Sequence, residues 1–157
     1  GDGLLPMEEI IASLIKDKPA NLKLVALTGK NTSLYKKLLS KFGDSVQILK
    51  YTEQIPQFMC GADMIISKAG GLSSAEVLAS DLDFIIYKPL PGQEENNAKF
   101  LAANCGATIA SDTKAITQKV EELCKLEENI AKERAYYGKP QAAEKISNYI
   151  LGRLSKI

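Results

Sequence analysis

Short apolar runs alternate along the chain with longer segments in which apolar residues recur at helical spacing. Runs such as 64–67 and 84–87 are nearly continuous, which is typical of strands covered on both faces of a parallel sheet. The pattern predicts strands at 22–27, 46–50, 64–67, 84–87 and 107–110, and helices at 7–15, 32–42, 56–60, 73–79, 93–104, 112–125, 127–137 and 140–154. This alternation indicates an α/β fold with a Rossmann-like open parallel sheet and flanking helices.

Several residues suit the predicted helix ends. Gly43 and Gly106 follow helical segments as stop signals, and Asp112 is suited to cap the helix that follows it. The chain opens with the glycine-rich turn Gly1-Asp2-Gly3, which leads into a helix, but no strand precedes that turn in the sequence. We therefore expect residues 1–157 to form one domain that is a piece of a longer protein.

Composition narrows the range of functions. The 157 residues carry a net charge of +1 and no histidine, which argues against nucleic-acid binding, histidine-dependent catalysis and histidine-rich metal sites. The three cysteines Cys60, Cys105 and Cys124 are widely spaced, which favours free thiols in a reducing cytoplasm. No apolar run is long enough to cross a bilayer.

Three glycine-bearing turns follow predicted strands, at residues 28–31, 68–73 and 89–93. Ligands of open α/β sheets bind outside the carboxyl ends of the strands, so these turns mark the candidate site. Gly70 and Gly71 let backbone amides approach an anion, and a helix opening at Ser73 adds unpaired N–H groups suited to a phosphate. A plain turn with Ser73 as the helix cap fits the same residues.

Polar side chains near these turns suit a nucleotide and a sugar. Glu76 can accept hydrogen bonds from a ribose diol, although Ser73-x-x-Glu76 also matches a capping box. Lys30 and Asn31 can contact a phosphate or a sugar, or can be exposed turn residues. A third set of polar side chains comprises Gln93, Glu94 and Asn97. Their amide and carboxylate groups can bind a polyhydroxyl ligand, or they can simply form the polar first turn of a helix.

The stretches at 68–76 and 87–98, read KAGGLSSAE and YKPLPGQEENNA, resemble a known signature. They are similar to the C-terminal, donor-binding half of GT-B glycosyltransferases of the monogalactosyldiacylglycerol synthase and processive diacylglycerol glucosyltransferase group. The similarity to the peptidoglycan N-acetylglucosaminyltransferase is more distant. The helix and strand order matches this half across essentially the whole chain.

The resemblance implies a role for each part of the candidate site. It implies diphosphate binding by Gly70, Gly71 and Ser73, and ribose binding by Glu76. It implies sugar binding by Gln93 and Glu94, supported by Asn97, and phosphate contacts near Lys30 and Asn31. It further implies main-chain contacts to the base from the stretch that holds Tyr51, Thr52 and Ile55.

Two departures from the family stand out in this sequence. Residues 1–5 carry fewer glycines than the family's first loop, and Asp81-Leu82-Asp83 replaces its usual Gly-x-Pro turn. The acceptor domain, where the family keeps its catalytic base and membrane contacts, lies outside these residues. No catalytic residue and no metal ligand are therefore assigned.

We expect a domain that binds UDP-glucose or UDP-galactose, without a separate cofactor, for transfer to a lipid such as diacylglycerol. The full-length enzyme is expected to be cytoplasmic and peripheral to the membrane, and the isolated domain to be inactive. Two alternatives remain open: a separate catalytic subunit of a two-chain UDP-N-acetylglucosaminyltransferase, and a non-catalytic nucleotide-binding module.

Overall fold

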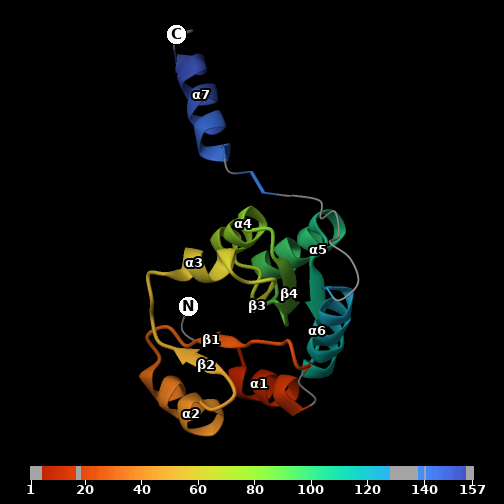
Figure 1. The fold of residues 1–157 in the computed structure, drawn as a ribbon. Coiled ribbons are helices and arrows are strands. Elements are labelled where there is room, and N and C mark those ends of the chain that lie inside the picture. The colour runs from red at the N-terminus through yellow and green to blue at the C-terminus, as the bar shows by residue number, and fades with distance from the viewer. Residues whose placement is uncertain (1–4, 17–18, 128–137, 140, 155–157) are drawn as a thin grey trace.

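The computed structural model describes residues 5–16, 19–127, 138–139 and 141–154. Helices and strands alternate along the chain in the predicted order (Figure 1). The elements are α1 (Met7–Lys16), β1 (Val25–Leu27), α2 (Thr32–Phe42), β2 (Gln47–Leu49), α3 (Ile55–Cys60), β3 (Met64–Ser67), α4 (Gly71–Ala79), β4 (Asp83–Tyr87), α5 (Gln93–Cys105), β5 (Thr108–Ala110), α6 (Thr113–Glu127) and α7 (Ala142–Leu154). The turn at 1–3 and the helix expected at 127–137 lie outside the described residues, apart from Glu127, which ends α6.

All strand pairs are parallel, which confirms the open parallel α/β architecture, but the backbone ladder divides into two sheets. One sheet has the order β1-β2, and the other has the order β3-β4-β5. Ala26 pairs with Ile48 in the first sheet, and Ile85 pairs with both Ile66 and Thr108 in the second. We call them the small sheet and the large sheet.

The large sheet carries most of the core because helices cover both of its faces. On one face, Ile85 and Tyr87 of β4 pack in a cluster that includes residues of α1 and α6. On the other face, Phe84 and Ile86 pack with residues of α4 and α5. The central strand β4 is therefore almost completely buried, with Ile85 and Ile86 each 0% exposed.

The small sheet has one separate apolar cluster. It joins Ile48 of β2 to Leu38 and Phe42 of α2 and to Ile11 of α1. Two neighbouring residues of α1, Ile10 and Ile11, therefore belong to different cores, because Ile10 packs on the large-sheet side. Helix α1 connects the two sheets through side chains on both flanks of its buried face.

The predicted helix ends are partly confirmed. Gly106 ends α5 in the left-handed conformation at φ 70°, and the Asp112 carboxylate accepts a hydrogen bond from the Ala115 N–H at 2.8 Å. Gly43 ends α2 in an ordinary helical conformation, where an added Cβ would lie only 2.6 Å from the Leu39 carbonyl oxygen. At Gly43 the glycine is required by packing, whereas at Gly106 it is required by the backbone angle.

The prediction that α4 begins at Ser73 was wrong. The helix begins at Gly71 with Gly70 as its cap, so Ser73 lies inside the first turn and is exposed. The capping-box interpretation of Ser73 and Glu76 fails with it, because that motif requires the serine at the cap position.

Helix α7 extends away from the rest of the described chain (Figure 1). Its apolar residues Ile146, Tyr149 and Ile150 are each more than half exposed. Among the described residues, no helix combines the length and apolar character needed to cross a membrane.

Candidate functional site

The strand-to-helix turns lie at the carboxyl ends of the strands, where open α/β sheets place their ligands. Because β3 and β4 are neighbours, the turn at 68–70 and the loop at 88–92 lie side by side at one edge of the large sheet. The turn at 28–31 and the segment that begins at Tyr51 follow the two strands of the small sheet. Each sheet therefore gathers its own half of the predicted site residues.

Gly70 and Gly71 form an open backbone surface at the start of α4. Gly70 has φ −67°, a conformation that any residue adopts, and a Cβ added at either glycine would meet nothing within 4 Å. Gly92 and Gly106, in contrast, have positive φ angles, and Gly43 has no space for a Cβ. Neither conformation nor packing among the described residues requires glycine at 70 and 71, and their backbone is open to close approach by a ligand.

The first turns of α4 add donors and a carboxylate to this surface. Gly70 caps the helix without a side-chain hydrogen bond, so the first amides keep their capacity to bind an anion. Ser73 and Glu76 are both exposed on this helix. Ser74 is buried, and within the described part of the chain its Oγ has no hydrogen-bond partner.

The loop between β4 and α5 is held in shape by its own hydrogen bonds. The Leu90 N–H donates to Oε2 of Glu94 at 2.9 Å, and Gly92 adopts φ 93°, which favours glycine. Gln93 begins α5 and is exposed, while Glu94 is half-buried. One carboxylate oxygen of Glu94 therefore shapes the loop, and the Gln93 amide lies open to solvent.

Two hydrogen bonds tie this loop to the glycine turn. Nδ2 of Asn97 donates to the carbonyl oxygen of Ala69 at 2.9 Å, and Nζ of Lys68 donates to the carbonyl oxygen of Lys88. Lys88 has φ 41°, an unusual value for a residue with a side chain. The predicted phosphate turn and the predicted sugar loop are thus connected directly, and Asn97 is one of the connecting residues.

The small-sheet half is organised by a helix cap and an aromatic contact. Oδ1 of Asn31 accepts a hydrogen bond from the Leu34 N–H at 2.9 Å and caps α2. Nζ of Lys30 lies 5.8 Å from the ring centroid of Tyr51, a side chain that is 63% exposed. This contact brings the turns after β1 and β2 together.

The rest of the predicted base-binding stretch lies at the start of α3. Oγ1 of Thr52 accepts a hydrogen bond from the Gln54 N–H at 3.0 Å, and Ile55 is the first residue of the helix. Among the described residues, no hydrogen bond, ion pair or cation–π contact joins Lys30, Asn31 and the stretch 51–55 to the residues at 70–76 or 93–97.

Sequence reasoning missed three lysines at this edge. Lys50, Lys68 and Lys88 each directly follow a strand, so together with Lys30 a lysine stands in the turn after each of β1 to β4. Within the described ranges, the observed ion pairs involve other lysines. Nζ of Lys50 lies 4.8 Å from the ring centroid of Tyr35, and Nζ of Lys88 lies 5.2 Å from that of Tyr87. The signal in the sequence was a lysine directly after the predicted strands 64–67 and 84–87 and at the last position of the predicted strand 46–50.

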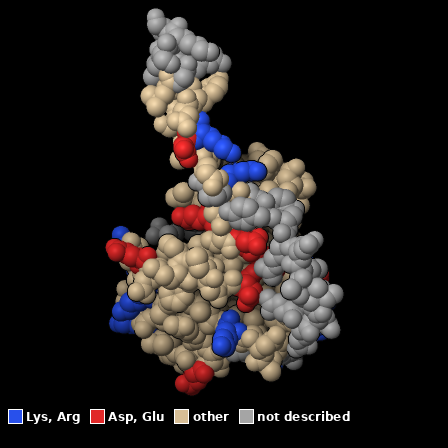
Figure 2. Space-filling view, turned by 45° about the horizontal axis from the view of Figure 1, so that its top comes forward, with Lys and Arg blue, Asp and Glu red and all other residues tan. Residues whose placement is uncertain are grey.

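The turns and helix starts at the carboxyl ends of the strands carry these four lysines together with the carboxylates Glu76 and Glu94. In the face shown in Figure 2, acidic and basic side chains lie singly or in small groups among uncharged residues. Among the residues that the structure describes, no group of three His, Cys, Asp or Glu side chains is placed to hold a metal ion. Backbone amides at the start of α4 and the ammonium groups of these lysines are groups that can bind an anion.

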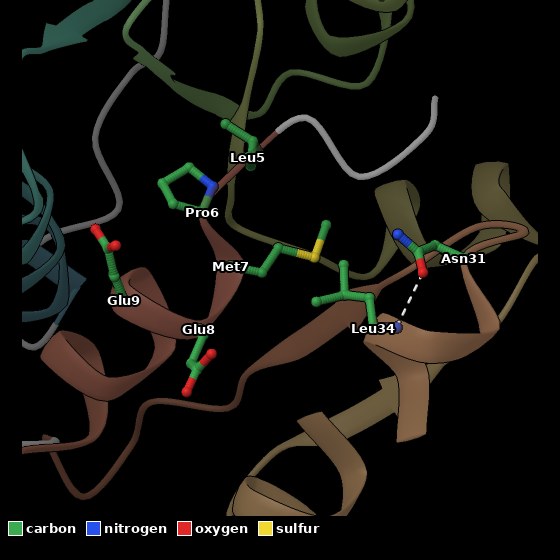
Figure 3. A pocket seen from close by; sticks show the side chains of 7 residues that line it. All are labelled: Leu5, Pro6, Met7, Glu8, Glu9, Asn31 and Leu34. Atoms are coloured by element: carbon green, nitrogen blue, oxygen red, sulfur yellow. Dashed lines mark hydrogen bonds between the residues drawn. The ribbon is translucent and has the colours of Figure 1, made fainter. Parts of the chain in front are cut away.

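A separate pocket of about 240 Å³ lies between the start of α1 and the start of α2 (Figure 3). Its lining includes Leu5, Met7 and Asn31 together with the acidic residues Glu8 and Glu9. The two carboxylates disfavour an anionic ligand in this pocket. None of the predicted residues between 51 and 97 lines it.

Comparison with known proteins identifies the family of the chain. Residues 6–150 match the family described as "Glycosyltransferase family 28 C-terminal domain". The chain is 32% identical over 120 residues to a processive diacylglycerol beta-glucosyltransferase of Bacillus subtilis, and this match covers 74% of the chain and 31% of the relative. The enzyme of the same name from Bacillus pumilus is 31% identical over 127 residues, with 79% and 33% covered.

The chain spans about a third of the length of these relatives. The family match, by contrast, covers nearly the whole chain, from the first residues of α1 into α7. The chain therefore belongs to the glycosyltransferase family 28 C-terminal domain family.

Proposed function

We propose that this chain is the donor-binding half of a glycosyltransferase and binds a UDP-sugar, UDP-glucose or UDP-galactose, for transfer to a lipid hydroxyl such as that of diacylglycerol. The observation that carries the proposal is the open backbone at Gly70 and Gly71. It lies at the start of α4, at the same end of the sheets as the lysines that follow the strands, Lys30, Lys50, Lys68 and Lys88. A doubly charged diphosphate suits this arrangement because unpaired helix amides and ammonium groups both attract it.

The nucleotide extends from this glycine turn in the proposal. The amides at Gly70 and Gly71 and the hydroxyl of Ser73 bind the diphosphate, and the exposed Glu76 carboxylate accepts hydrogen bonds from the ribose diol. The base lies along the stretch containing Tyr51, Thr52 and Ile55. Lys30 and Asn31 approach a phosphate from the turn after β1.

The sugar lies against the loop between β4 and α5. Gln93 offers an exposed amide, and Glu94 keeps one carboxylate oxygen beyond the one that binds the Leu90 N–H. Asn97 supports this loop through the Ala69 carbonyl oxygen. Fixed amides and lysines around the diphosphate stabilise the charge that develops on UDP as the sugar leaves.

The acceptor side of the reaction is assigned to a separate N-terminal domain of a longer enzyme. The relatives of Bacillus subtilis and Bacillus pumilus support this division because the chain covers only 31% and 33% of their lengths. In this proposal the full-length enzyme is cytoplasmic and contacts the membrane through that domain. The chain alone binds the donor and transfers no sugar.

The replacement Glu76→Ala tests the proposal. Loss of two hydrogen bonds to a charged group is expected to cost about 1.5 to 3 kcal/mol of UDP affinity, roughly tenfold to a hundredfold. Calorimetric titration with UDP and with 2′-deoxy-UDP measures this loss. The variant should lose less affinity for 2′-deoxy-UDP, because that ligand already lacks one hydroxyl of the diol.

A matched control replaces an exposed glutamate of another helix, Glu144→Ala in α7, and should leave UDP affinity unchanged. Equal losses for UDP and 2′-deoxy-UDP would contradict the ribose role of Glu76. Binding of NAD by the unaltered chain, with no response to uridine nucleotides, would contradict the function as a whole.

A further inference from the structure

Lys88 has a backbone conformation that its own sequence does not favour. Among the described residues, two residues other than glycine have a positive φ angle, Asp81 at 55° and Lys88 at 41°. Aspartate adopts this region more readily because its short side chain can bond the local backbone, an advantage that lysine lacks. Lys88 also precedes Pro89, and a residue before proline ordinarily adopts an extended conformation. Contacts with the surrounding structure therefore hold Lys88 in this bend.

The described contacts of Lys88 lie on both sides of its Cα atom. Its N–H donates to the carbonyl oxygen of Ala110 in β5 at 3.1 Å, and its carbonyl oxygen accepts a hydrogen bond from Nζ of Lys68. Its own Nζ lies 5.2 Å from the ring centroid of the buried Tyr87. The N–H bond continues the ladder between β4 and β5, so it acts before the bend. On the carbonyl side, where the chain leaves the sheet, the contact comes from Lys68.

Lys68 is placed for this contact because it directly follows β3. In the parallel pair of β3 and β4, Ser67 lies opposite Ile86, so Lys68 leaves the sheet beside the end of β4. Lys68 is half-buried, whereas Lys88 is exposed. The ion pairs observed in the described part of the chain do not include Lys68. The partner that the structure gives to its ammonium group is therefore a backbone carbonyl oxygen.

The bend at Lys88 sets the path of the loop that follows it. Residues 89–92 lead into α5, and the Leu90 N–H donates to Oε2 of Glu94 at 2.9 Å. The Glu95 N–H donates in turn to the carbonyl oxygen of Leu90 at 3.0 Å. The loop and the first turn of α5 are thus bonded to each other, so a rotation about the backbone of Lys88 would move them as one unit.

The far end of this unit is held by a different residue. Nδ2 of Asn97 donates to the carbonyl oxygen of Ala69 at 2.9 Å, and Ala69 is the neighbour of Lys68 in the sequence. The two hydrogen bonds run in opposite directions between the glycine turn and the loop. Lys68 therefore fixes the start of the loop, and Asn97 fixes its end.

We propose that Lys68 is a positioning residue for the sugar part of the donor. By binding the carbonyl oxygen of Lys88, it holds the bend that places Gln93 and Glu94 against the sugar. The inference rests on the proposed function, from which it takes the sugar-binding role of these two residues. Because Lys68 acts through the loop, it contributes more to the affinity for a UDP-sugar than to the affinity for UDP.

The test replaces Lys68 by methionine, which keeps a long unbranched side chain and loses the hydrogen-bond donor. Calorimetric titration compares UDP with UDP-glucose and UDP-galactose. In Lys68→Met, the affinity for the UDP-sugar that the unaltered chain binds better should fall about tenfold more than the affinity for UDP. Lys68→Arg, which keeps a charged donor, should retain more of the UDP-sugar affinity than Lys68→Met.

Loss of positive charge alone does not produce this result. UDP, whose terminal phosphate is free, carries at least as much negative charge as a UDP-sugar. A lysine that only attracted the diphosphate would therefore affect UDP at least as strongly as the UDP-sugar.

A pair of double variants tests whether Lys68 acts through the bend at Lys88. Asparagine adopts positive φ angles several-fold more often than most residues, so Lys88→Asn added to Lys68→Met should recover part of the lost UDP-sugar affinity. The matched control adds Lys88→Met to Lys68→Met. It removes the same ammonium group without favouring the bend, and it should recover none of the affinity.

Amide hydrogen exchange of the ligand-free chain gives a readout that needs no donor. In Lys68→Met, the Lys88 amide, which bonds to Ala110, should exchange at least about fivefold faster than in the unaltered chain. The amides of Ile85 and Ile86 at the centre of β4 serve as references and should not change.

Equal losses for UDP and the UDP-sugar, or a larger loss for UDP, would assign Lys68 to the diphosphate and overturn the proposal. A lower midpoint of thermal unfolding with an unchanged ratio of the two affinities would make Lys68 a purely structural residue and overturn it as well. Equal recovery in both double variants, or unchanged exchange of the Lys88 amide, would show that Lys68 does not act through the bend.

Failure of the proposed function gives a different result. In that case the unaltered chain binds neither UDP nor a UDP-sugar, and exchange of the Lys88 amide still decides whether Lys68 holds the bend. When the unaltered chain binds its donor, the outcomes for the Lys68 variants overturn only the role of Lys68.

Discussion

The large and small sheets are built from the same kind of parallel strand but differ in how completely each strand is covered. In the large sheet, Ile85 and Ile86 of β4 are 0% exposed and lie between two neighbouring strands and two layers of helices. In the small sheet, Val25 is 45% exposed and one cluster supports both strands. The most completely buried strand is thus the one with neighbouring strands on both edges and helices on both faces.

The same difference extends to the loops. On the large sheet, Asn97 and Lys68 connect two neighbouring loops by hydrogen bonds to backbone carbonyl oxygens. On the small sheet, the two turns meet through the Lys30 ammonium and the exposed Tyr51 ring. The large-sheet half is therefore the more preorganised half of the candidate site, because fixed donors do not have to be ordered when a ligand binds.

The largest effect is expected from a cavity at the centre of the large sheet. Ile85→Ala removes a fully buried side chain and should lower the free energy of unfolding by about 2 to 5 kcal/mol. Val25→Ala, at the exposed edge of the small sheet, should cost less than about 1 kcal/mol. Urea denaturation followed by circular dichroism measures the free energy of unfolding of both variants. Similar losses in the two variants would contradict the claim that the large sheet is the better buried of the two.

The next effect concerns the connection between the large-sheet loops. Asn97→Ala leaves the carbonyl oxygen of the buried Ala69 without its donor, which should cost about 1 to 3 kcal/mol of stability. UDP-sugar affinity should fall as well, because the loop is no longer held against the glycine turn. The neighbouring exposed residue gives the matched control, Asn96→Ala, which should change neither quantity. An unaltered unfolding midpoint for N97A would show that the connection contributes nothing.

A smaller effect is expected on the small sheet. Tyr51→Leu removes the ring that Lys30 contacts, an interaction that at an exposed site contributes about 0.5 to 1 kcal/mol. In the proposed function the base lies beside this residue, so UDP and UDP-glucose should lose affinity equally. Tyr51→Phe keeps the ring and should retain most of the affinity. If the Tyr51→Leu variant lost affinity for UDP-glucose but not for UDP, Tyr51 would contact the sugar and not the base.

The smallest effect concerns the attachment of α1 to the small sheet. Hydrogen bonds from Lys37 and Lys41 lower the pKa of Glu8 from 4.5 to about 2. Because the folded-state pKa is the lower one, the ion pairs stabilise the protein fully above about pH 4.5, and this contribution is lost as the pH falls toward 2. In the Glu8→Gln variant, the midpoint of thermal unfolding should depend less on pH between about 4.5 and 2 than in the unaltered protein. The difference should be clearer at low salt, where charges are screened less. Identical profiles for both proteins would remove Glu8 as a stabilising contact.

Much of the fold was predictable because its signals are local. Strand β3 was predicted with its observed bounds, and Asp112 was predicted as a cap that the structure confirms. The start of α4 was predicted wrongly. Serine is a better helix cap than glycine, so local preference favoured Ser73 over Gly70. The roles predicted for Gly70, Glu76 and Gln93 stay predictions until nucleotide binding is measured.

The sequence by itself determined the order of helices and strands, the parallel α/β class and the turns that carry the candidate site, because apolar periodicity and glycine placement act over a few residues. Only the tertiary structure decided that the strands form two sheets, that α1 packs against both, and that Asn97 and Lys68 connect neighbouring loops. These features depend on which distant segments become neighbours. Strands β1 and β4 are both mainly apolar, and their different burial follows from the strands and helices that lie beside them.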